Sequence, residues 1–459
     1  MKRRTASASP VASGETESDP FARDRSHYLI ALFISYLGFG MSSFASTYII
    51  YDLSGSVAVT GLLVVCTALP TLLLSTTATS VVNRWGGPKL YLVCQFGWVA
   101  VWFVAVVLSA TGRLNTASML GIFLMLGIVQ GLALPTPGLV RLMITAPGRA
   151  PELNSAAIRN IAVGTVIGLI LGGHIFAIAG PTWIFLLAAL SEVPLIFAIY
   201  PLVRKASRLI REASRRPPIT RERFRDLLAT PRSNPGLRAA FICMLIACLI
   251  GSFTVTLPAI ASSIGTDPRI LSFLQAGSIV GGIFVALAAR NLHGRVSWGS
   301  VQRVCYFVAA FGLGGLVWAT HFNGSRVIVF TIALIVIIPV GFALSLDTSI
   351  LSALVQLGAP ADDRAAVFTG FSLILLLGIP FGQELCGLIA DVFSVSIAIG
   401  AIAVSALLFL IVRPLHAHLR SAFDTLDAQT ATPVVAGRAS LPHASSYEPV
   451  APGDGTIQR

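Results

Sequence analysis

The stretch GTVIGLILGG, residues 164–173, lies inside a long apolar run, although four of its ten residues are glycine. Glycine costs roughly 1 kcal/mol relative to alanine at each interior helix position, so this many glycines need a reason. In a bilayer, small residues let two helix backbones approach closely and gain dispersion contacts. Gly164, Gly168 and Gly172 follow at i, i+4 and i+8 and therefore share one helix face. The stretch predicts a membrane helix that packs tightly against another helix.

The composition of the whole chain is typical of a protein with many membrane spans. Its 459 residues are 55% apolar and only 11% charged, and the mean hydropathy is +0.82. Soluble domains carry about 25% charged residues. The apolar runs are about 20 residues long, which suits a membrane helix, whereas a barrel strand needs about 10 residues. These features predict an all-α membrane protein.

The apolar runs predict twelve transmembrane helices. They lie near 28–50, 57–82, 90–111, 117–140, 155–178, 182–203, 239–262, 270–289, 304–320, 327–355, 366–390 and 395–412. With both termini on one side of the membrane, that side carries 29 of the 32 Lys and Arg residues. Because cytoplasmic loops are enriched in basic residues, we expect a multi-pass protein of the cell membrane with both termini in the cytoplasm.

The spans fall into two six-helix bundles joined by a basic segment. The bundles cover 28–203 and 239–412, and the linker 204–238 holds 11 basic and 3 acidic residues. We expect this cytoplasmic linker to lie on anionic lipid rather than to bind nucleic acid. The tails, 1–27 and 413–459, are rich in Ser, Ala, Pro and Thr, and we predict that they are disordered and cytoplasmic.

An internal repeat relates the two halves. Three glycines of the fifth span recur 214 residues later in the eleventh span: Gly164, Gly168 and Gly173 correspond to Gly378, Gly382 and Gly387. Two repeated bundles around a central site are the architecture of many secondary transporters. We therefore expect the glycine stripe to lie where helices of opposite halves meet and slide. A static packing motif would give the same pattern, so that alternative stays open.

These motifs resemble those of the major facilitator superfamily, in particular its bacterial branch of enterobactin exporters. Gly164, Gly168, Gly172 and Gly173 match the antiporter motif of that superfamily, and Leu169 stands where proline is usual. The resemblance covers about 28–412 and implies two six-helix bundles. It also implies export by proton antiport.

Two further motifs of that superfamily are present in altered form. Arg84 and Gly86 match its loop signature between the second and third spans, but Asn83 replaces the family's aspartate. Gln130 matches the signature of the fourth span, but Gly127 replaces an arginine that the family uses in proton coupling. If the protein couples transport to protons, other residues must contribute.

Three acidic residues lie inside predicted spans, where a charge costs several kcal/mol and so suggests a function. Glu384 is the first candidate for proton coupling, because it shares a helix stripe with Gly387 and with Asp391 near the outer end. Asp347 and Glu192 are the other candidates. For each carboxyl, a hydrogen-bonded packing role is the alternative.

Neutral polar residues in the spans suggest a path for a substrate. The candidates are small or amide side chains of spans one, four and eight: Ser35, Ser42, Ser46, Gln130 and Gln275. No Lys or Arg lies in the middle of a span, whereas a carrier for a multiply charged anion would need a fixed cation. The pattern favours a neutral, cationic or amphipathic small molecule with an apolar body.

The sequence thus predicts a secondary transporter that exports a small amphipathic molecule, such as a drug, siderophore or secondary metabolite, by alternating access coupled to protons. Uptake, facilitated diffusion, or a sensor that does not transport are the alternatives. We expect a monomer in the lipid bilayer, with no cofactor or metal. An enzyme is disfavoured, because the sequence has no nucleophile–base set, metal spacing or phosphate loop.

Overall fold

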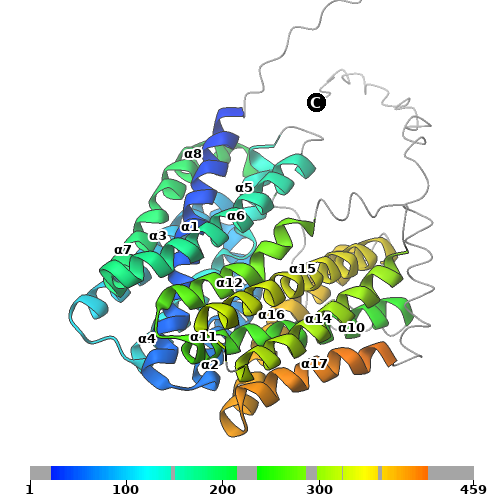
Figure 1. Cartoon of the computed structure of the whole chain (residues 1–459). Coiled ribbons are helices and arrows are strands. Elements are labelled where there is room, and N and C mark those ends of the chain that lie inside the picture. The colour runs from blue at the N-terminus through cyan, green and yellow to red at the C-terminus, as the bar shows by residue number, and fades with distance from the viewer. Residues whose placement is uncertain are drawn as a thin grey trace, which may run out of the picture.

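The structure is a computed structural model that describes residues 22–145, 150–213, 235–285, 297–322, 324–359 and 364–411. The described residues form helices only (Figure 1). The first half contains α1 (Ala22–Ser54), α2 (Val57–Trp85), α3 (Gly87–Ala110), α4 (Thr116–Ala133), α5 (Thr136–Met143), α6 (Ala150–Ala179), α7 (Pro181–Ser191) and α8 (Val193–Ala213). The second half contains α10 (Pro235–Gly251), η1 (Ser252–Thr256), α11 (Leu257–Ile264), α12 (Pro268–Ile283), α14 (Trp298–His321), α15 (Arg326–Gly358), α16 (Arg364–Val392) and α17 (Val395–Ile411).

These helices make twelve membrane spans, as the sequence predicts. Among the described residues, ten helical stretches are long and apolar enough to cross a membrane, and α17 and α12 are shorter. Three spans are interrupted: α4 continues into α5, α7 into α8, and α10 into η1 and α11. The chain is therefore an all-α membrane protein with two bundles of six spans.

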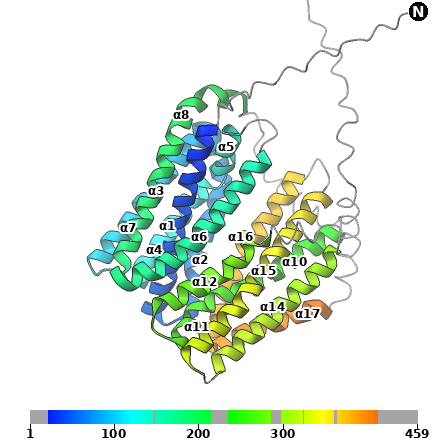
Figure 2. The same ribbon diagram turned by 45° about the horizontal axis from the view of Figure 1, so that its top comes forward.

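The two bundles lie side by side and meet mainly through two helix pairs. One pair is α6 with α12 and the other is α2 with α16 (Figures 1 and 2). The main cluster of buried apolar side chains extends through both bundles. Close contacts between the halves involve the C-terminal parts of α6 and α16, where Gly173 faces Ser272 and Gly387 faces Ala58.

The glycines of the repeat occupy equivalent places in the two halves. A methyl group on Gly168 would lie 2.1 Å from the carbonyl oxygen of Leu37 on α1. Its counterpart Gly382 on α16 packs less tightly against Ser252, where α10 continues into η1. Within each half, the fifth span therefore packs on the first, which confirms the repeat as a structural feature.

Most of the glycine stripe lies inside one half, contrary to our expectation. Gly164, Gly168 and Gly172 all face α1 of their own bundle, so the prediction that they lie between opposite halves is wrong. Only the neighbouring Gly173 faces the other half, where a methyl group would lie 2.5 Å from Cβ of Ser272 on α12. The i, i+4, i+8 stripe turns toward α1, and Gly173 points about 100° away from Gly172.

A second pair of glycines that the sequence analysis missed follows the same repeat. Gly127 on α4 packs against the backbone of Thr67 on α2, and Gly341 on α15 packs against the backbone of Ser278 on α12. The two glycines are 214 residues apart. The fourth span of each half therefore lies against the second span with the same close approach.

The loop signature around Arg84 and Gly86 forms a tight connection between α2 and α3. Gly86 is the single residue between the two helices and has φ of +85°, a conformation that favours glycine. Its amide donates to the carbonyl of Val82 and so closes the last turn of α2. Arg84 lies exposed in that last turn.

The predicted boundaries of the bundles shift by a few residues. α1 begins at Ala22, so the last residues of the predicted tail 1–27 are helical. α8 extends to Ala213, which places the first part of the linker 204–238 in a helix. Residues 214–234 and 412–459 lie outside the described residues.

Candidate functional site

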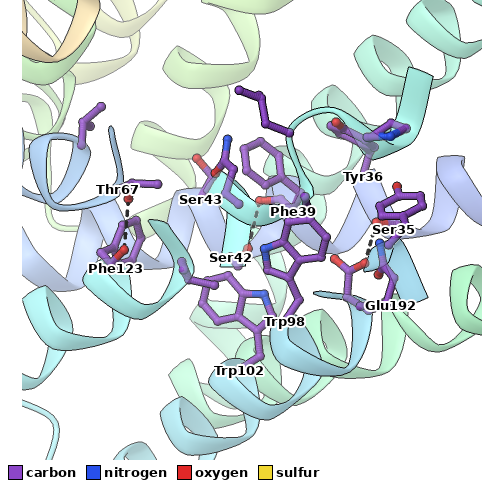
Figure 3. Close-up of a pocket in the computed structure, with 18 residues that line it drawn as sticks. Ser35, Tyr36, Phe39, Ser42, Ser43, Thr67, Trp98, Trp102, Phe123 and Glu192 are labelled. Atoms are coloured by element: carbon purple, nitrogen blue, oxygen red, sulfur yellow. Dashed lines mark hydrogen bonds between the residues drawn. The ribbon is translucent and has the colours of Figure 1, made fainter. Parts of the chain in front are cut away.

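A cavity of about 500 Å³ lies within the first half of the protein (Figure 3). Its walls come from α1, α2, α3, α4 and α5 and from the junction of α7 and α8. The side chains are mostly apolar and aromatic with a few polar groups: Ser35, Tyr36, Phe39, Ser42, Ser43, Val64, Thr67, Tyr91, Gln95, Trp98, Trp102, Phe123, Leu126, Gln130, Ala133, Leu134, Pro137 and Glu192. The size and the mixed lining are those of a site for a drug-sized ligand.

One carboxylate faces this cavity at a break in the sixth span. α7 ends at Ser191 and α8 begins at Val193, which leaves Glu192 between the two helices. Pro194 follows, and a proline has no amide hydrogen to continue the hydrogen bonds of α7. The side chain of Glu192 is only 7% exposed, and the hydroxyl of Ser35 on α1 donates to its Oε2 at 2.8 Å.

Aromatic side chains surround most of the cavity. The six that line it are Tyr36, Phe39, Tyr91, Trp98, Trp102 and Phe123. Trp102 is held in place by stacking on Phe185 of α7, with ring centroids 5.9 Å apart. Gln95 is 1% exposed, and its Oε1 has no hydrogen-bond partner among the described residues. The cavity thus offers aromatic faces to a ligand, with a few polar side chains among them.

Breaks in the helices shape one end of the cavity. α4 ends at Ala133, and Pro135 separates it from α5 because a proline cannot donate to the preceding turn. Leu134 and Pro137, on either side of this break, both line the cavity. Gln130 lies one turn before the break and is exposed.

The structure brings some of the predicted cavity residues together and separates others. Ser35, Ser42 and Gln130 line the cavity. Ser46 lies further along α1, 1% exposed, and Gln275 lies on α12 in the other half, so neither lines it. The sequence reasoning missed Gln95 and the aromatic residues of α3. Their spacing at i, i+3 and i+7 marks one helix face, but an aromatic face alone does not separate a cavity from a packed core.

Asp347 lies in the packed interior of the second half. It is 2% exposed on α15, and the side chains of Gln302 and Tyr306 on α14 lie beside it. Neither of its carboxylate oxygens has a partner that meets hydrogen-bond geometry within the described residues. Asp347 therefore faces a neighbouring helix, away from the cavity that Glu192 lines.

Glu384 lies at the contact between the two halves. A methyl group on Gly61 of α2 would lie 3.2 Å from Oε2 of Glu384, so the carboxyl rests against that backbone. This Oε2 is buried without a hydrogen-bond partner in the described part of the chain. The neighbouring Gln383 donates its amide to Thr254 at 3.0 Å within its own half. The three acidic candidates thus occupy three separate places.

No group of three or more His, Cys, Asp or Glu side chains is arranged to hold a metal ion within the residues that the structure describes. The polar groups of the cavity are instead a carboxylate, hydroxyls and amides. Such groups bind a ligand by hydrogen bonds and by charge.

Comparisons with known proteins place the fold. A search of curated proteins finds no match to the chain. The nucleoside transporter NupG superposes with a TM-score of 0.65 at 13% identity, over 87% of this chain and 99% of that chain. A bacterial homologue of the iron transporter ferroportin in an inward-facing state superposes with a TM-score of 0.66 at 16% identity, over 87% of this chain and 98% of that chain. The peptide transporter POT in complex with alafosfalin superposes with a TM-score of 0.64 at 13% identity, over 88% of this chain and 95% of that chain.

The sequence profile of the Major Facilitator Superfamily matches residues 28–383, which is most of the chain and reaches across both bundles. The fold, the repeat and this match agree, and the protein belongs to the Major Facilitator Superfamily of membrane transporters.

Proposed function

We propose that this protein exports a small amphipathic molecule from the cytoplasm in exchange for protons, by alternating access. The observation that carries the proposal is the cavity of about 500 Å³. It is large enough for a drug-sized molecule and mixes aromatic walls with Glu192, Ser35 and Gln95. The neighbours that are named for nucleosides, iron and peptides differ in cargo, so the cargo is argued from this cavity.

Buried carboxyls support the coupling to protons. Glu192 and Asp347 are buried in their bundles, and Glu384 lies at the contact between α2 and α16; none of the three forms an ion pair within the described residues. A carboxyl that is alternately neutral and charged is the usual proton carrier inside a membrane. The resemblance of residues 164–173 to an antiporter motif supports export.

Transport in proteoliposomes tests the proposal. Vesicles would carry a trapped fluorescent pH indicator, and valinomycin with equal K⁺ on both sides would hold the membrane potential at zero. We expect that at least one of a panel of neutral, cationic and zwitterionic aromatic amphiphiles moves uphill when a pH difference is imposed, with protons moving in the opposite direction.

A pair of tryptophan variants links transport to the cavity. Trp98→Ala removes a ring from the wall and so enlarges the cavity. Trp318→Ala is the control, because this tryptophan of α14 is 54% exposed and does not line the cavity. We expect only the first variant to change the apparent KM of the transported compound. Movement of protons and compound in the same direction would favour uptake, and movement without proton flux would favour a facilitator. No compound-dependent flux from the whole panel would favour a sensor.

A further inference from the structure

The lining of the cavity indicates the charge of its ligand. Among its 18 lining residues, Glu192 is the only acidic one, and none is Lys, Arg or His. Glu192 receives one hydrogen bond, from Ser35, and has no ion-pair partner in the described residues. An unpaired carboxylate in an apolar site is costly, and a cationic group on the ligand would offset that cost.

The aromatic walls suit the same ligand. The faces of Trp, Tyr and Phe attract cations within about 6 Å of the ring centroid, and tryptophan does so most strongly. Trp98 and Trp102 lie beside one another in Figure 3, and Trp98 is the nearer of the two to Glu192. A ligand with one positive charge and an aromatic or apolar body would contact both the rings and the carboxylate.

We infer that the ligand of this cavity is an organic monocation with an apolar body. That the ligand is transported rests on the proposed function, but its binding to the cavity can be measured without transport. One carboxylate balances one positive charge, so a dication or an anion fits less well.

Binding of two ions of the same shape tests this inference. Tetraphenylphosphonium and tetraphenylborate share a body and differ in the sign of the charge. Quenching of tryptophan fluorescence in the full-length protein in detergent, corrected with empty micelles, reports occupancy near Trp98 and Trp102. We expect saturable binding of the cation that is about tenfold tighter, or more, than that of the anion.

Two variants separate the charge from the shape of the site. Glu192→Gln should weaken binding of tetraphenylphosphonium by about tenfold and leave tetraphenylborate unchanged or tighter. Asp347→Asn, which changes a buried carboxyl outside the cavity, should leave both unchanged. Equal or tighter binding of the anion by the unchanged protein would overturn the inference, whether or not the variants fold. Cation binding without transport would instead contradict only the proposed function.

A second inference comes from the contact between α2 and α16. The carboxylate of Asp391, in the last turn of α16, accepts hydrogen bonds from the amides of Val57 at 2.8 Å and Ala58 at 3.0 Å. It also accepts one from the hydroxyl of Ser56, the N-cap residue of α2. The first amides of a helix have no partner within the helix and attract a negative charge. Here the partner comes from the other half of the protein.

The backbones of the two helices lie unusually close below this cap. A methyl group on Gly387 would lie 2.7 Å from Cα of Ala58. One turn further, Gly61 of α2 lies against the backbone of Gln383. The cap of Asp391 and these two glycines therefore hold α2 and α16 together at one end.

We propose that Asp391 is a positioning residue that latches the two halves at this end. During alternating access the two helices must separate here, and α2 then loses three hydrogen bonds to the other half. These hydrogen bonds are charge-assisted and stabilise the closed contact, so removing them by mutation should favour the separated state strongly enough to measure. Substrate contact plays no part in this role.

Distances between spin labels test the latch. Labels on Leu53 and Val392, which are 45% and 71% exposed at the ends of α1 and α16, report separation at this end in lipid nanodiscs. We expect Asp391→Ala to raise the population of long distances by about fivefold or more. Asp391→Asn keeps a hydrogen-bond acceptor without the charge. Its population of long distances should therefore lie between those of the unchanged protein and Asp391→Ala.

Asp267 provides a matched control. It caps α12 at the same end of the protein, but it accepts from the amide of Arg269 within its own half. Asp267→Ala should therefore leave the distance distribution unchanged. An unchanged distribution in Asp391→Ala, or an equal change in both alanine variants, would overturn the latch. The labels report this result without any substrate, so the proposed cargo does not affect it.

Discussion

Among the described residues, each half of the protein buries one carboxylate inside its own bundle, and the surroundings of the two differ. Glu192 lies at the junction of α7 and α8, beside a cavity of about 500 Å³. Asp347 lies in the middle of the continuous helix α15 and is covered by packed side chains that include Tyr306. A carboxylate beside a cavity can exchange its neighbours for a ligand, whereas a packed one keeps the same neighbours. The comparison favours ligand binding in the first half.

The two spans of the first half that lie beside the cavity each contain a proline, which removes one backbone hydrogen bond. Pro194 and the break at Glu192 interrupt the sixth span, and the break around Pro135 interrupts the fourth. In the second half, the fourth and sixth spans are α15, which continues through Pro339, and α17. The repeat therefore conserves the close helix contacts of both halves, and the cavity lies beside the prolines in the fourth and sixth spans of the first half.

The largest effect should follow from the carboxylate beside the cavity. We expect Glu192→Gln to lower both uphill and downhill transport of tetraphenylphosphonium by about tenfold or more, because the ligand loses its charge partner. Initial rates in proteoliposomes, at matched protein content, measure this effect. If Glu192→Gln kept downhill transport and lost only uphill transport, Glu192 would carry the proton and not the ligand.

A smaller and more selective loss is expected for Glu384→Gln. Oε2 of Glu384 is buried against Gly61, and it would become accessible when α2 and α16 separate. A residue that exchanges protons there should be needed for transport against a gradient but not for downhill exchange. We expect this variant to bind tetraphenylphosphonium normally and to lose extrusion driven by an imposed pH difference. Normal uphill transport would remove Glu384 from the coupling.

The sequence was sufficient for the fold because the relevant signals are long and repeated. Apolar runs, the distribution of basic residues and the glycine repeat all agree on two bundles of six helices. The direction of a glycine stripe was not predictable, because a stripe specifies close packing but not the partner, and α1 proved to be the partner of Gly164, Gly168 and Gly172. The position of Glu192 at a helix break was equally hidden, since Pro194 marks the break but not the cavity beside it.

The equivalent glycines of the two halves should differ in their tolerance of alanine. A methyl group on Gly168 would lie 2.1 Å from the backbone oxygen of Leu37, whereas one on Gly382 would lie no closer than 3.2 Å, to Cβ of Ser252. We expect Gly168→Ala to destabilise the protein by about 1–3 kcal/mol through overpacking. Gly382→Ala should cost about 1 kcal/mol or less.

Thermal unfolding in detergent measures this difference. Gly121→Ala is a control, because no atom lies within 4 Å of a methyl group added to that glycine of α4. Equal unfolding temperatures for Gly168→Ala and Gly382→Ala would show that the first half can relax around its tighter contact.

The smallest effect is expected for Asp347→Asn. Both carboxylate oxygens lack a hydrogen-bond partner in the described residues, so replacing the carboxyl by an amide of the same shape removes little favourable interaction. It also removes a group whose charged form is costly in the packed interior of a membrane protein. We expect the unfolding temperature to stay the same or to rise, by an amount equivalent to about 1 kcal/mol or less, and ligand binding to be unchanged.

Measuring proton-driven transport would further distinguish the roles of Asp347 and Glu192. If Asp347→Asn stopped uphill transport while binding and stability remained, the packed carboxyl would carry the proton for the ligand site in the other half, and the two halves would divide one mechanism between them.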